Sequence, residues 1–119
     1  MITGIGIDMI ELDRIEKQID NVAFINRVLT PEERDLFFSL GRKRKTEFLA
    51  GRFSAKEAYA KAKGTGLGQL SFQDIVIINN SLGQPVLEDR TASGTAVHLS
   101  ITHTDRSAAA VAVIESLSC

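Results

Sequence analysis

The feature that most constrains the fold is a helical pattern from Arg42 to Gly68, the longest in the chain. About 20 residues of α-helix span about 30 Å, which is the width of a small domain. In a chain of 119 residues, every other element must therefore pack against this helix. Eight of the 14 basic residues lie in the stretch: Arg42, Lys43, Arg44, Lys45, Arg52, Lys56, Lys61 and Lys63.

Glu57 lies on one stripe of this helix, with Phe53 one turn before it and Lys61 one turn after it. A Glu followed by a Lys four residues later favours an ion pair worth about 0.2–0.5 kcal/mol. The small residues of the stripe also leave room above the carboxylate for a ligand. The helical pattern by itself favours the ion pair.

A glycine-rich segment, GTGLG, ends the helix. Gly64 is a natural C-terminal cap, because glycine adopts the left-handed conformation without a Cβ penalty. Three glycines exceed what capping requires, so Gly66 and its neighbours favour close approach of the backbone to a phosphate. The segment is not a P-loop, since its glycines follow a helix and no Gly-Lys-Ser/Thr comes after them.

Residues 2–10 alternate as a β-strand does. The apolar side chains of one face oppose small and acidic residues on the other: Ile5, Ile7 and Met9 against Gly4, Gly6 and Asp8. Two glycines weaken a strand unless something must come close to it. Asp8 ends the glycine face, as a ligand-binding carboxylate, as the cap of the next helix, or as both.

The remaining pattern predicts a single α+β domain over residues 1–119. A helix is expected over 11–20, a short turn over 21–28, and a helix ending near residue 40 that begins with Thr30, Pro31 and Glu33. Strands are expected over 75–78, 84–89, 97–103 and 108–115, with the last one central or at an interface because both its faces are apolar. Short loops between strands predict a mainly antiparallel sheet, with the helices on one face.

Composition and charge exclude several classes of protein. No run of about 18 apolar residues predicts a membrane span, and the start, MITGIGID, lacks the basic region of a secretion signal. The one cysteine, Cys119, excludes a disulfide framework and fits a cytoplasmic protein. A net charge of −1 and 6% aromatic residues argue against nucleic-acid binding, while the central basic cluster suggests a local anionic ligand.

Three features can form one site: Asp8, the Glu57–Lys61 pair, and His103 at the end of a strand. Two carboxylates among basic residues suit a hard divalent cation that also binds phosphate oxygens, and the basic side chains neutralise the remaining phosphate charge. The set outlines a phosphoryl-transfer or pyrophosphate-binding site. His103 shares its strand face with apolar side chains, which by itself is typical of a buried core histidine.

Five motifs follow one another along the chain: GIGIDMIELDRI, FLAGRFSAKEAYAKAKGTGLG, SFQDI, GQP and HLSITHT. Together they resemble the holo-acyl-carrier-protein synthase group of phosphopantetheinyl transferases over essentially the whole chain. The resemblance implies the fold of that group and a magnesium-dependent transfer of 4'-phosphopantetheine from coenzyme A to a serine of apo acyl carrier protein. It also implies release of adenosine 3',5'-bisphosphate and a role in fatty acid biosynthesis.

The resemblance implies a role for each matching residue. Asp8 and Glu57 match the magnesium ligands, and both are expected to act in catalysis with Lys61. Arg14 and Arg27 match contacts of the acidic carrier protein. Coenzyme A-binding positions are matched by Lys43, Arg52, Lys61, Gly64, Gly66, Pro85 and His103. Compact members of the group are homotrimers with clefts between subunits, so His103 and Glu57 are expected to reach one site from different chains.

Some alternatives stay open. The general base is either Glu57 or a metal-bound water. Acidic neighbours dilute the charge around Arg14, so carrier docking is expected to rely more on Ile19, Val22 or Phe24. Two other classes use the same features: a magnesium-dependent hydrolase of nucleotide pyrophosphates, and a non-catalytic module that binds RNA or an acidic protein.

Overall fold

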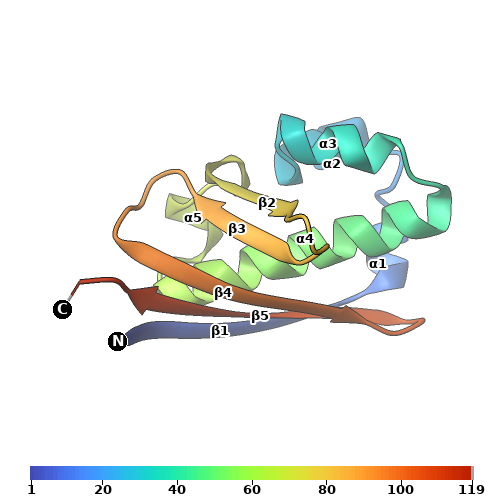
Figure 1. The fold of residues 1–119 in the computed structure, drawn as a ribbon. Helices are drawn as coiled ribbons and strands as arrows, with labels where there is room; N and C mark the ends of the chain where they lie inside the picture. Colours follow the sequence, from blue (N-terminus) through green and yellow to red (C-terminus); the bar gives the residue numbers. More distant parts are fainter. Residues whose placement is uncertain (119) are drawn as a thin grey trace.

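A computed structural model of the chain describes residues 1–118, and Cys119 lies outside the described residues. Its elements follow the order shown in Figure 1. The helices are α1 (Leu12–Glu16), α2 (Val22–Val28), α3 (Pro31–Phe38), α4 (Arg42–Lys63), α5 (Gly66–Gln69) and the short 3₁₀ helix η1 (Phe72–Asp74). The strands are β1 (Ile2–Glu11), β2 (Ile75–Asn79), β3 (Pro85–Asp89), β4 (Thr95–His103) and β5 (Ser107–Ser116).

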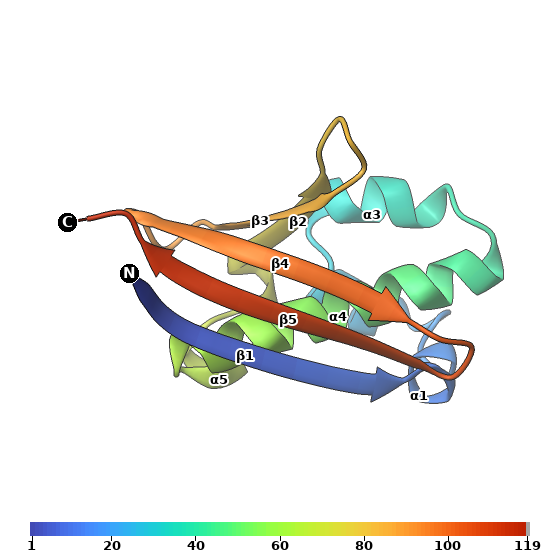
Figure 2. The ribbon, with the colours of Figure 1, turned by 60° about the horizontal axis from the view of Figure 1, so that its bottom comes forward.

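All strand pairs are antiparallel, and the strands form two sheets. The larger sheet has the order β1-β5-β4, so the expectation that the last strand is central is confirmed. The hairpin of β2 and β3 forms a separate sheet, and its residues Ile75, Ile77 and Leu87 are buried in one cluster with Tyr59 of α4. The predicted α+β class with helices on one face of the main sheet is confirmed, as Figure 2 shows from the sheet side.

Helix α4 lies across the larger sheet and organises the core. Small side chains on its buried faces, such as Ala50 and Ala58, have no exposed surface. One apolar cluster joins α4 to α1, α2 and α3, and the other joins it to β2, β3 and the main sheet. None of the helices within residues 1–118 combines the length and apolar character needed to cross a membrane.

The glycine face of β1 lies directly against the backbone of α4. A Cβ built on Gly4 would lie 2.0 Å from the Ala62 carbonyl oxygen, and one on Gly6 would lie 2.0 Å from the Ala58 carbonyl oxygen. The group that must come close to this strand is therefore the helix. Asp8, two residues beyond Gly6 on the same face, is consequently directed towards α4.

Local signals in the sequence located several element boundaries. Thr30 and Glu33 form the expected capping box at the start of α3, and Gly64 ends α4 with a φ of 81°. Two expectations differ. The helix predicted over residues 11–20 ends at Glu16, and the turn predicted over 21–28 is the seven-residue helix α2, whose first turn the Asn21 side chain caps.

Candidate active site

Asp8, Glu57 and Lys61 come together where β1 crosses α4. The Lys61 Nζ donates to Asp8 Oδ1 at 3.2 Å and to the Ile7 carbonyl oxygen at 3.1 Å. The ion pair that the helical spacing favoured, Glu57 with Lys61, is replaced by one between Lys61 and Asp8. Asp8 does not cap α1, which begins after Glu11. The carboxylate of Asp8 therefore belongs to this cluster.

Glu57 lies close enough to Asp8 for the charges of the two carboxylates to interact. Partial burial raises the pKa of Glu57 above its ordinary value, the negative charge of Asp8 raises it further, and Lys61 opposes both effects. Two carboxylates held near each other repel, and a bound cation relieves that repulsion. Within residues 1–118 no third histidine, cysteine or acidic side chain joins them in a cation-binding group. A two-carboxylate set fits Mg²⁺, which usually keeps several waters and binds substrate phosphate oxygens as well.

A pocket of about 390 Å³ opens in front of Glu57. Arg27 of α2 forms one wall, and its guanidinium lies 5.6 Å from the Phe24 ring centroid and 5.9 Å from that of Phe72. The structure thus brings Arg27 to the same pocket as Glu57, whereas Arg14 is exposed on α1 and does not line it. Sequence reasoning missed the adjoining wall, formed by Leu67, Gly68, Leu70, Ser71 and Phe72.

Gly64 and Gly66 follow Lys61 at the C-terminal end of α4. Their φ angles are 81° and 66°, a region that side chains with a Cβ rarely adopt. A Cβ on either residue would meet nothing within 4 Å. The backbone conformation therefore requires glycine at both positions. The open space beside them is compatible with the predicted close approach of a ligand.

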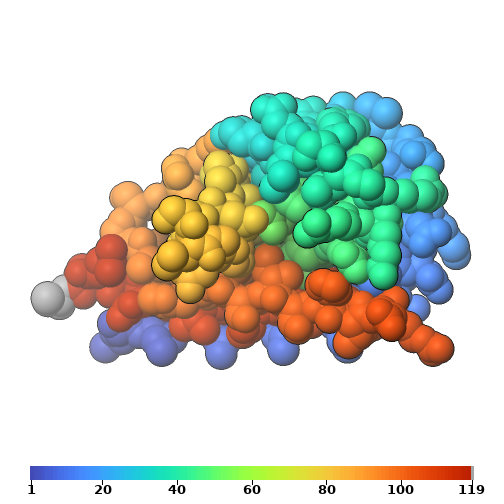
Figure 3. Space-filling model, turned by 45° about the vertical axis from the view of Figure 1, so that its right-hand side comes forward, coloured from blue at the N-terminus to red at the C-terminus, as the bar shows by residue number. Residues whose placement is uncertain are grey.

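Arg52 and His103 share a second pocket, between α3, α4, the β2–β3 hairpin and β4. Arg52 is 7% exposed, its guanidinium stacks 4.3 Å from the Phe48 ring centroid, and its NH2 donates to Asn79 Oδ1 at 3.2 Å. Burial lowers the pKa of Arg52 below its ordinary value. Pro85 adjoins this pocket as the ladder partner of Asn79. Figure 3 shows the surface hollowed where the yellow hairpin, blue-green α3 and orange β4 approach one another.

His103 is not a core histidine. Its side chain is 49% exposed, and Nδ1 lies 3.7 Å from a Glu47 carboxylate oxygen. The interpretation drawn from its apolar strand face is wrong, because His103 lies at the end of β4 and lines an open pocket beside Glu47 of α4. Arg44 and Asn79 also line this pocket and were missed, although Arg44 stands in the basic run RKRK.

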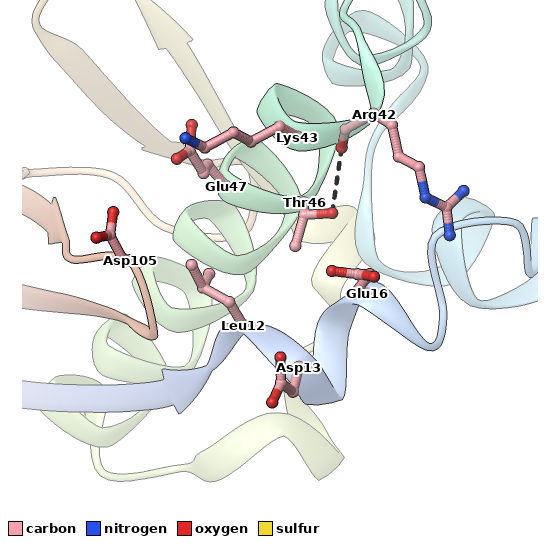
Figure 4. Close-up of a pocket in the computed structure, with 8 residues that line it drawn as sticks. All are labelled: Leu12, Asp13, Glu16, Arg42, Lys43, Thr46, Glu47 and Asp105. Carbon is pink, nitrogen blue, oxygen red and sulfur yellow. Dashed lines mark hydrogen bonds between the residues drawn. The ribbon is translucent and has the colours of Figure 1, made fainter.

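Lys43 lines a third pocket, with the first turn of α4 on one side and α1 on the other (Figure 4). Arg42, its neighbour, also lines the pocket, and its guanidinium pairs with Asp20 at 3.1 Å. Four carboxylates surround the opening: Asp13, Glu16, Glu47 and Asp105. Fourteen residues of helix separate Lys43 from Glu57, about 21 Å along the axis. One chain by itself therefore keeps Lys43 apart from Glu57, while Glu47 lines both the pocket of Lys43 and that of His103.

The family model described as the 4'-phosphopantetheinyl transferase superfamily matches residues 4–114. The chain belongs to this superfamily. Relatives in the superfamily include a holo-(acyl-carrier-protein) synthase of a Geobacillus species, 52% identical over 99% of this chain and 100% of that protein. Another, from Bacillus cytotoxicus, is 55% identical over the full length of both chains.

Solved structures of transferases with this name have the same fold. The holo-(acyl-carrier-protein) synthase of Bacillus anthracis, in complex with CoA (3',5'-ADP), has a TM-score of 0.91 at 51% identity and covers 98% of both chains. The enzyme of Helicobacter pylori, in complex with coenzyme A, has a TM-score of 0.80 at 33% identity and covers 93% of this chain and 99% of that one. These likenesses confirm the phosphopantetheinyl transferase fold expected from the motifs.

Proposed function

We propose that this chain transfers 4'-phosphopantetheine from coenzyme A to a serine hydroxyl of apo acyl carrier protein and so supports fatty acid biosynthesis. The observation that carries the proposal is the meeting of Asp8, Glu57 and Lys61 at the crossing of β1 and α4. The superfamily match over nearly the whole chain supplies the reaction class.

Asp8 and Glu57 hold magnesium in this proposal. Their carboxylate oxygens are the hard ligands that Mg²⁺ prefers. Burial is the larger cause of the raised pKa of Glu57, and the charge of Asp8 adds a repulsion that a cation would relieve. When bound, the ion supplies Lewis-acid polarisation of the pyrophosphate oxygens. The Lys61 ammonium, 3.2 Å from Asp8, lies where it neutralises charge on the departing phosphate.

The transfer exchanges one phosphorus–oxygen bond for another. The serine oxygen bonds to the phosphorus that carries pantetheine, and the bond from that phosphorus to the bridging oxygen breaks, leaving adenosine 3',5'-bisphosphate. The serine proton would go either to the Glu57 carboxylate or to a metal-bound water acting as the general base. Lys61 stabilises, or protonates, the oxygen that leaves.

The rest of coenzyme A is held by basic side chains and by the glycine backbone. Arg52, His103 and Lys43 face its phosphates, while Gly64, Gly66 and Pro85 line the nucleotide. Because these residues fall into separate pockets of one chain, a complete site needs a second copy.

A homotrimer supplies that second copy. The solvent-facing side of the main sheet carries Ile5, Ile7 and Met9 of β1, which are 68%, 67% and 70% exposed. Exposed apolar surface of this kind marks protein–protein contact sites. We place the interface between subunits on this sheet face and propose that the enzyme acts in the cytoplasm.

Carrier docking uses the surface around Glu57. Arg27 lies in the same pocket as Glu57, and Val22 on α2 is 61% exposed, so α2 offers both a cation and an apolar contact to an acidic carrier. Ile19, which the sequence placed among the apolar contacts, is 4% exposed and belongs to the core. Arg14 adds an exposed cation on α1.

One incubation tests the function: the chain with coenzyme A, Mg²⁺ and an apo acyl carrier protein, followed by mass spectrometry of the carrier. Transfer is expected to add one phosphopantetheine group and to release adenosine 3',5'-bisphosphate. Chelation of the metal is expected to stop both. Nucleotide release without a mass gain on the carrier would instead identify a pyrophosphate hydrolase, and the absence of any turnover would identify a binding module.

A further inference from the structure

Lys56, the neighbour of Glu57 in α4, is a lysine with no exposed side chain. Its Nζ donates to the Val28 carbonyl oxygen at 2.8 Å, to Glu33 Oε1 at 2.7 Å and to the Phe72 carbonyl oxygen at 3.1 Å. A lysine ammonium has three protons, so each one is used. Lys56 therefore joins α4 to the end of α2, to α3 and to η1 through a single atom.

Glu33, its partner, is equally buried and makes further links. Glu33 Oε1 also accepts from the Thr30 amide at 2.7 Å, and Oε2 accepts from the Ile77 amide of β2 at 2.8 Å. Burial lowers the pKa of Lys56, and the charge of Glu33 opposes that effect. A buried ion pair is often no more stabilising than an apolar pair of the same volume, because desolvation offsets the attraction. What this pair supplies is a fixed arrangement of the segments it joins.

Gln73 makes a second connection between the same segments. Its Nε2 donates to the carbonyl oxygens of Asn26, Arg27 and Leu29 at 2.8, 3.1 and 2.9 Å. The Gln73 side chain thus joins η1 directly to the C-terminal end of α2. Gln73 stands in the SFQDI motif, to which the proposed chemistry gives no task.

The segments held by Lys56 and Gln73 are the two walls of the pocket in front of Glu57. Arg27 precedes Val28, whose carbonyl Lys56 binds, and Phe72 supplies both a carbonyl to Lys56 and a ring beneath the Arg27 guanidinium. Lys56 is anchored one residue before Glu57 on the same helix. The hydrogen bonds of Lys56 therefore set the distance between the Glu57 carboxylate and both walls of the pocket.

We propose that Lys56, with Glu33, and Gln73 are positioning residues for the carrier protein: they hold Arg27 and Phe72 at a fixed place relative to Glu57. This rests on the proposed transfer to a carrier. Glu33 also bonds to Ile77 of β2, the strand that carries Asn79 of the nucleotide pocket. Loosening the Gln73 connection moves the docking walls while leaving the metal ligands and the nucleotide pockets in place. The affinity for the carrier should fall, and that for coenzyme A should not.

Two variants test the proposal by steady-state kinetics with each substrate varied in turn. Gln73→Ala removes the second connection without placing a charge in the core. The double variant Lys56→Met with Glu33→Gln removes the first without leaving one buried charge unpaired. Each is expected to raise the KM for apo carrier by about tenfold, and Gln73→Ala is expected to change the KM for coenzyme A by less than about twofold.

Tyr59→Phe is the matched control, since it removes a buried hydrogen bond to a carboxylate, that of Asp89, away from these walls. A carrier KM within about twofold of wild type in the folded variants overturns the proposal, as does an equal rise in Tyr59→Phe at the same loss of melting temperature. If the double variant does not fold, the Gln73→Ala variant alone tests the proposal.

Hydrogen exchange separates failure of this proposal from failure of the proposed function. Gln73→Ala is expected to speed amide exchange in residues 26–30 and 72–74, and Tyr59→Phe is not. This difference in exchange is expected even if the wild-type chain transfers nothing to a carrier. Absence of transfer would overturn only the proposed function. Unchanged exchange in both segments would overturn the positioning role.

Discussion

Lys61 binds Asp8 rather than Glu57, its neighbour one turn earlier in α4. Helical spacing placed Glu57 and Lys61 together, and it could not reveal the competing carboxylate, which arrives on a strand 53 residues away in sequence. Glu57 makes no ion pair within residues 1–118 and instead has a raised pKa, caused by burial and by Asp8. A carboxylate left in that state is suited to a ligand.

Replacing either carboxylate is expected to abolish transfer without unfolding the chain. Asp8→Asn and Glu57→Gln each remove one negative charge from the proposed magnesium site, and transfer should fall by at least about 100-fold, since losing even the outer partners of metal ligands costs about 10–100-fold. Lys61 is 55% exposed, so loss of its pair with Asp8 costs little stability. Carrier mass spectrometry measures the first effect and thermal denaturation the second. Near wild-type turnover in either variant would rule out the metal assignment.

At the scale of elements, the contact of β1 with α4 depends on two glycines, whose side chains are single hydrogen atoms. Gly4 and Gly6 let a strand lie against a helix backbone, which brings Asp8 to Lys61 and Glu57. The sequence indicated that something must approach the glycine face. The alternation of residues in β1 does not by itself distinguish a ligand from a helix as the group that packs against this face.

Gly6→Ala should therefore act on both stability and activity. Its Cβ would lie 2.0 Å from the Ala58 carbonyl oxygen and 2.7 Å from the Ala62 nitrogen, so β1 must move away from α4. Overpacking of this kind costs about 1–3 kcal/mol, and the displaced Asp8 should lower transfer as well. Gly41→Ala is the control, because a Cβ there meets nothing within 4 Å. Denaturant titration and the transfer assay together check the prediction, and equal behaviour of the two variants would contradict it.

The C-terminal end of α4 is held to β3 by Asp89. This carboxylate accepts hydrogen bonds from Tyr59, from Lys63 at 2.8 Å and from the Thr91 amide and hydroxyl at 2.8 and 2.6 Å. Burial alone would raise the pKa of Asp89, but these bonds outweigh it and lower the pKa from 3.8 to about 2. These bonds form a clip that holds Tyr59 and Lys63 of α4 to the end of β3.

Stability should consequently depend on Asp89 in acid. Because the folded pKa is lower than the unfolded one, the contribution is fully present above the unfolded pKa of 3.8 and is lost as the pH falls towards the folded pKa of about 2. The expected size is about 2 kcal/mol. Asp89→Asn should lack this part of the pH dependence. Urea unfolding of both proteins between pH 5 and about pH 2 measures it, and parallel curves for the two would show that the clip does not form.

At the scale of the whole molecule, the main sheet has one covered face and one open face. Helix α4 covers the inner face, while Ile5, Ile7 and Met9 remain exposed on the outer one. The pockets that hold Glu57 and Arg52 lie on different sides of α4, since five residues turn a helix by about 140° beyond one full turn. An assembly of several chains accounts for the exposed sheet face, because it covers that face. It also accounts for the separation of the pockets, because it brings together pockets of different chains.

A charge on the open face tests this assembly. Ile7→Asp is expected to fold, because the side chain is 67% exposed in the single chain, but to remain a monomer and lose transfer. Leu117→Asp, at a position 62% exposed beyond the end of β5, is the control and should stay trimeric and active. Sedimentation velocity reports the mass of each variant. A wild-type monomer, or an Ile7→Asp trimer, would exclude the interface on this face.

The sequence by itself determined the elements whose signals are local. The length of α4, its end at Gly64 and the capping box at Thr30 follow from residues a few positions apart, and so does the alternation of β1. It also placed the carboxylates Asp8 and Glu57 on single faces of their elements, and the motifs indicated the family that the comparisons then established.

Only the tertiary structure decided which charges meet. It paired Lys61 with Asp8, buried Lys56 against Glu33, and left His103 exposed at the end of β4. Lys56 shares its helix flank with the buried Leu49 and Ala60, which is the one local sign of its burial. The partners are 23 residues apart in sequence for Lys56 and Glu33 and 53 apart for Lys61 and Asp8. Their meeting depends on how β1, α3 and α4 pack, and no spacing within a single element encodes that packing.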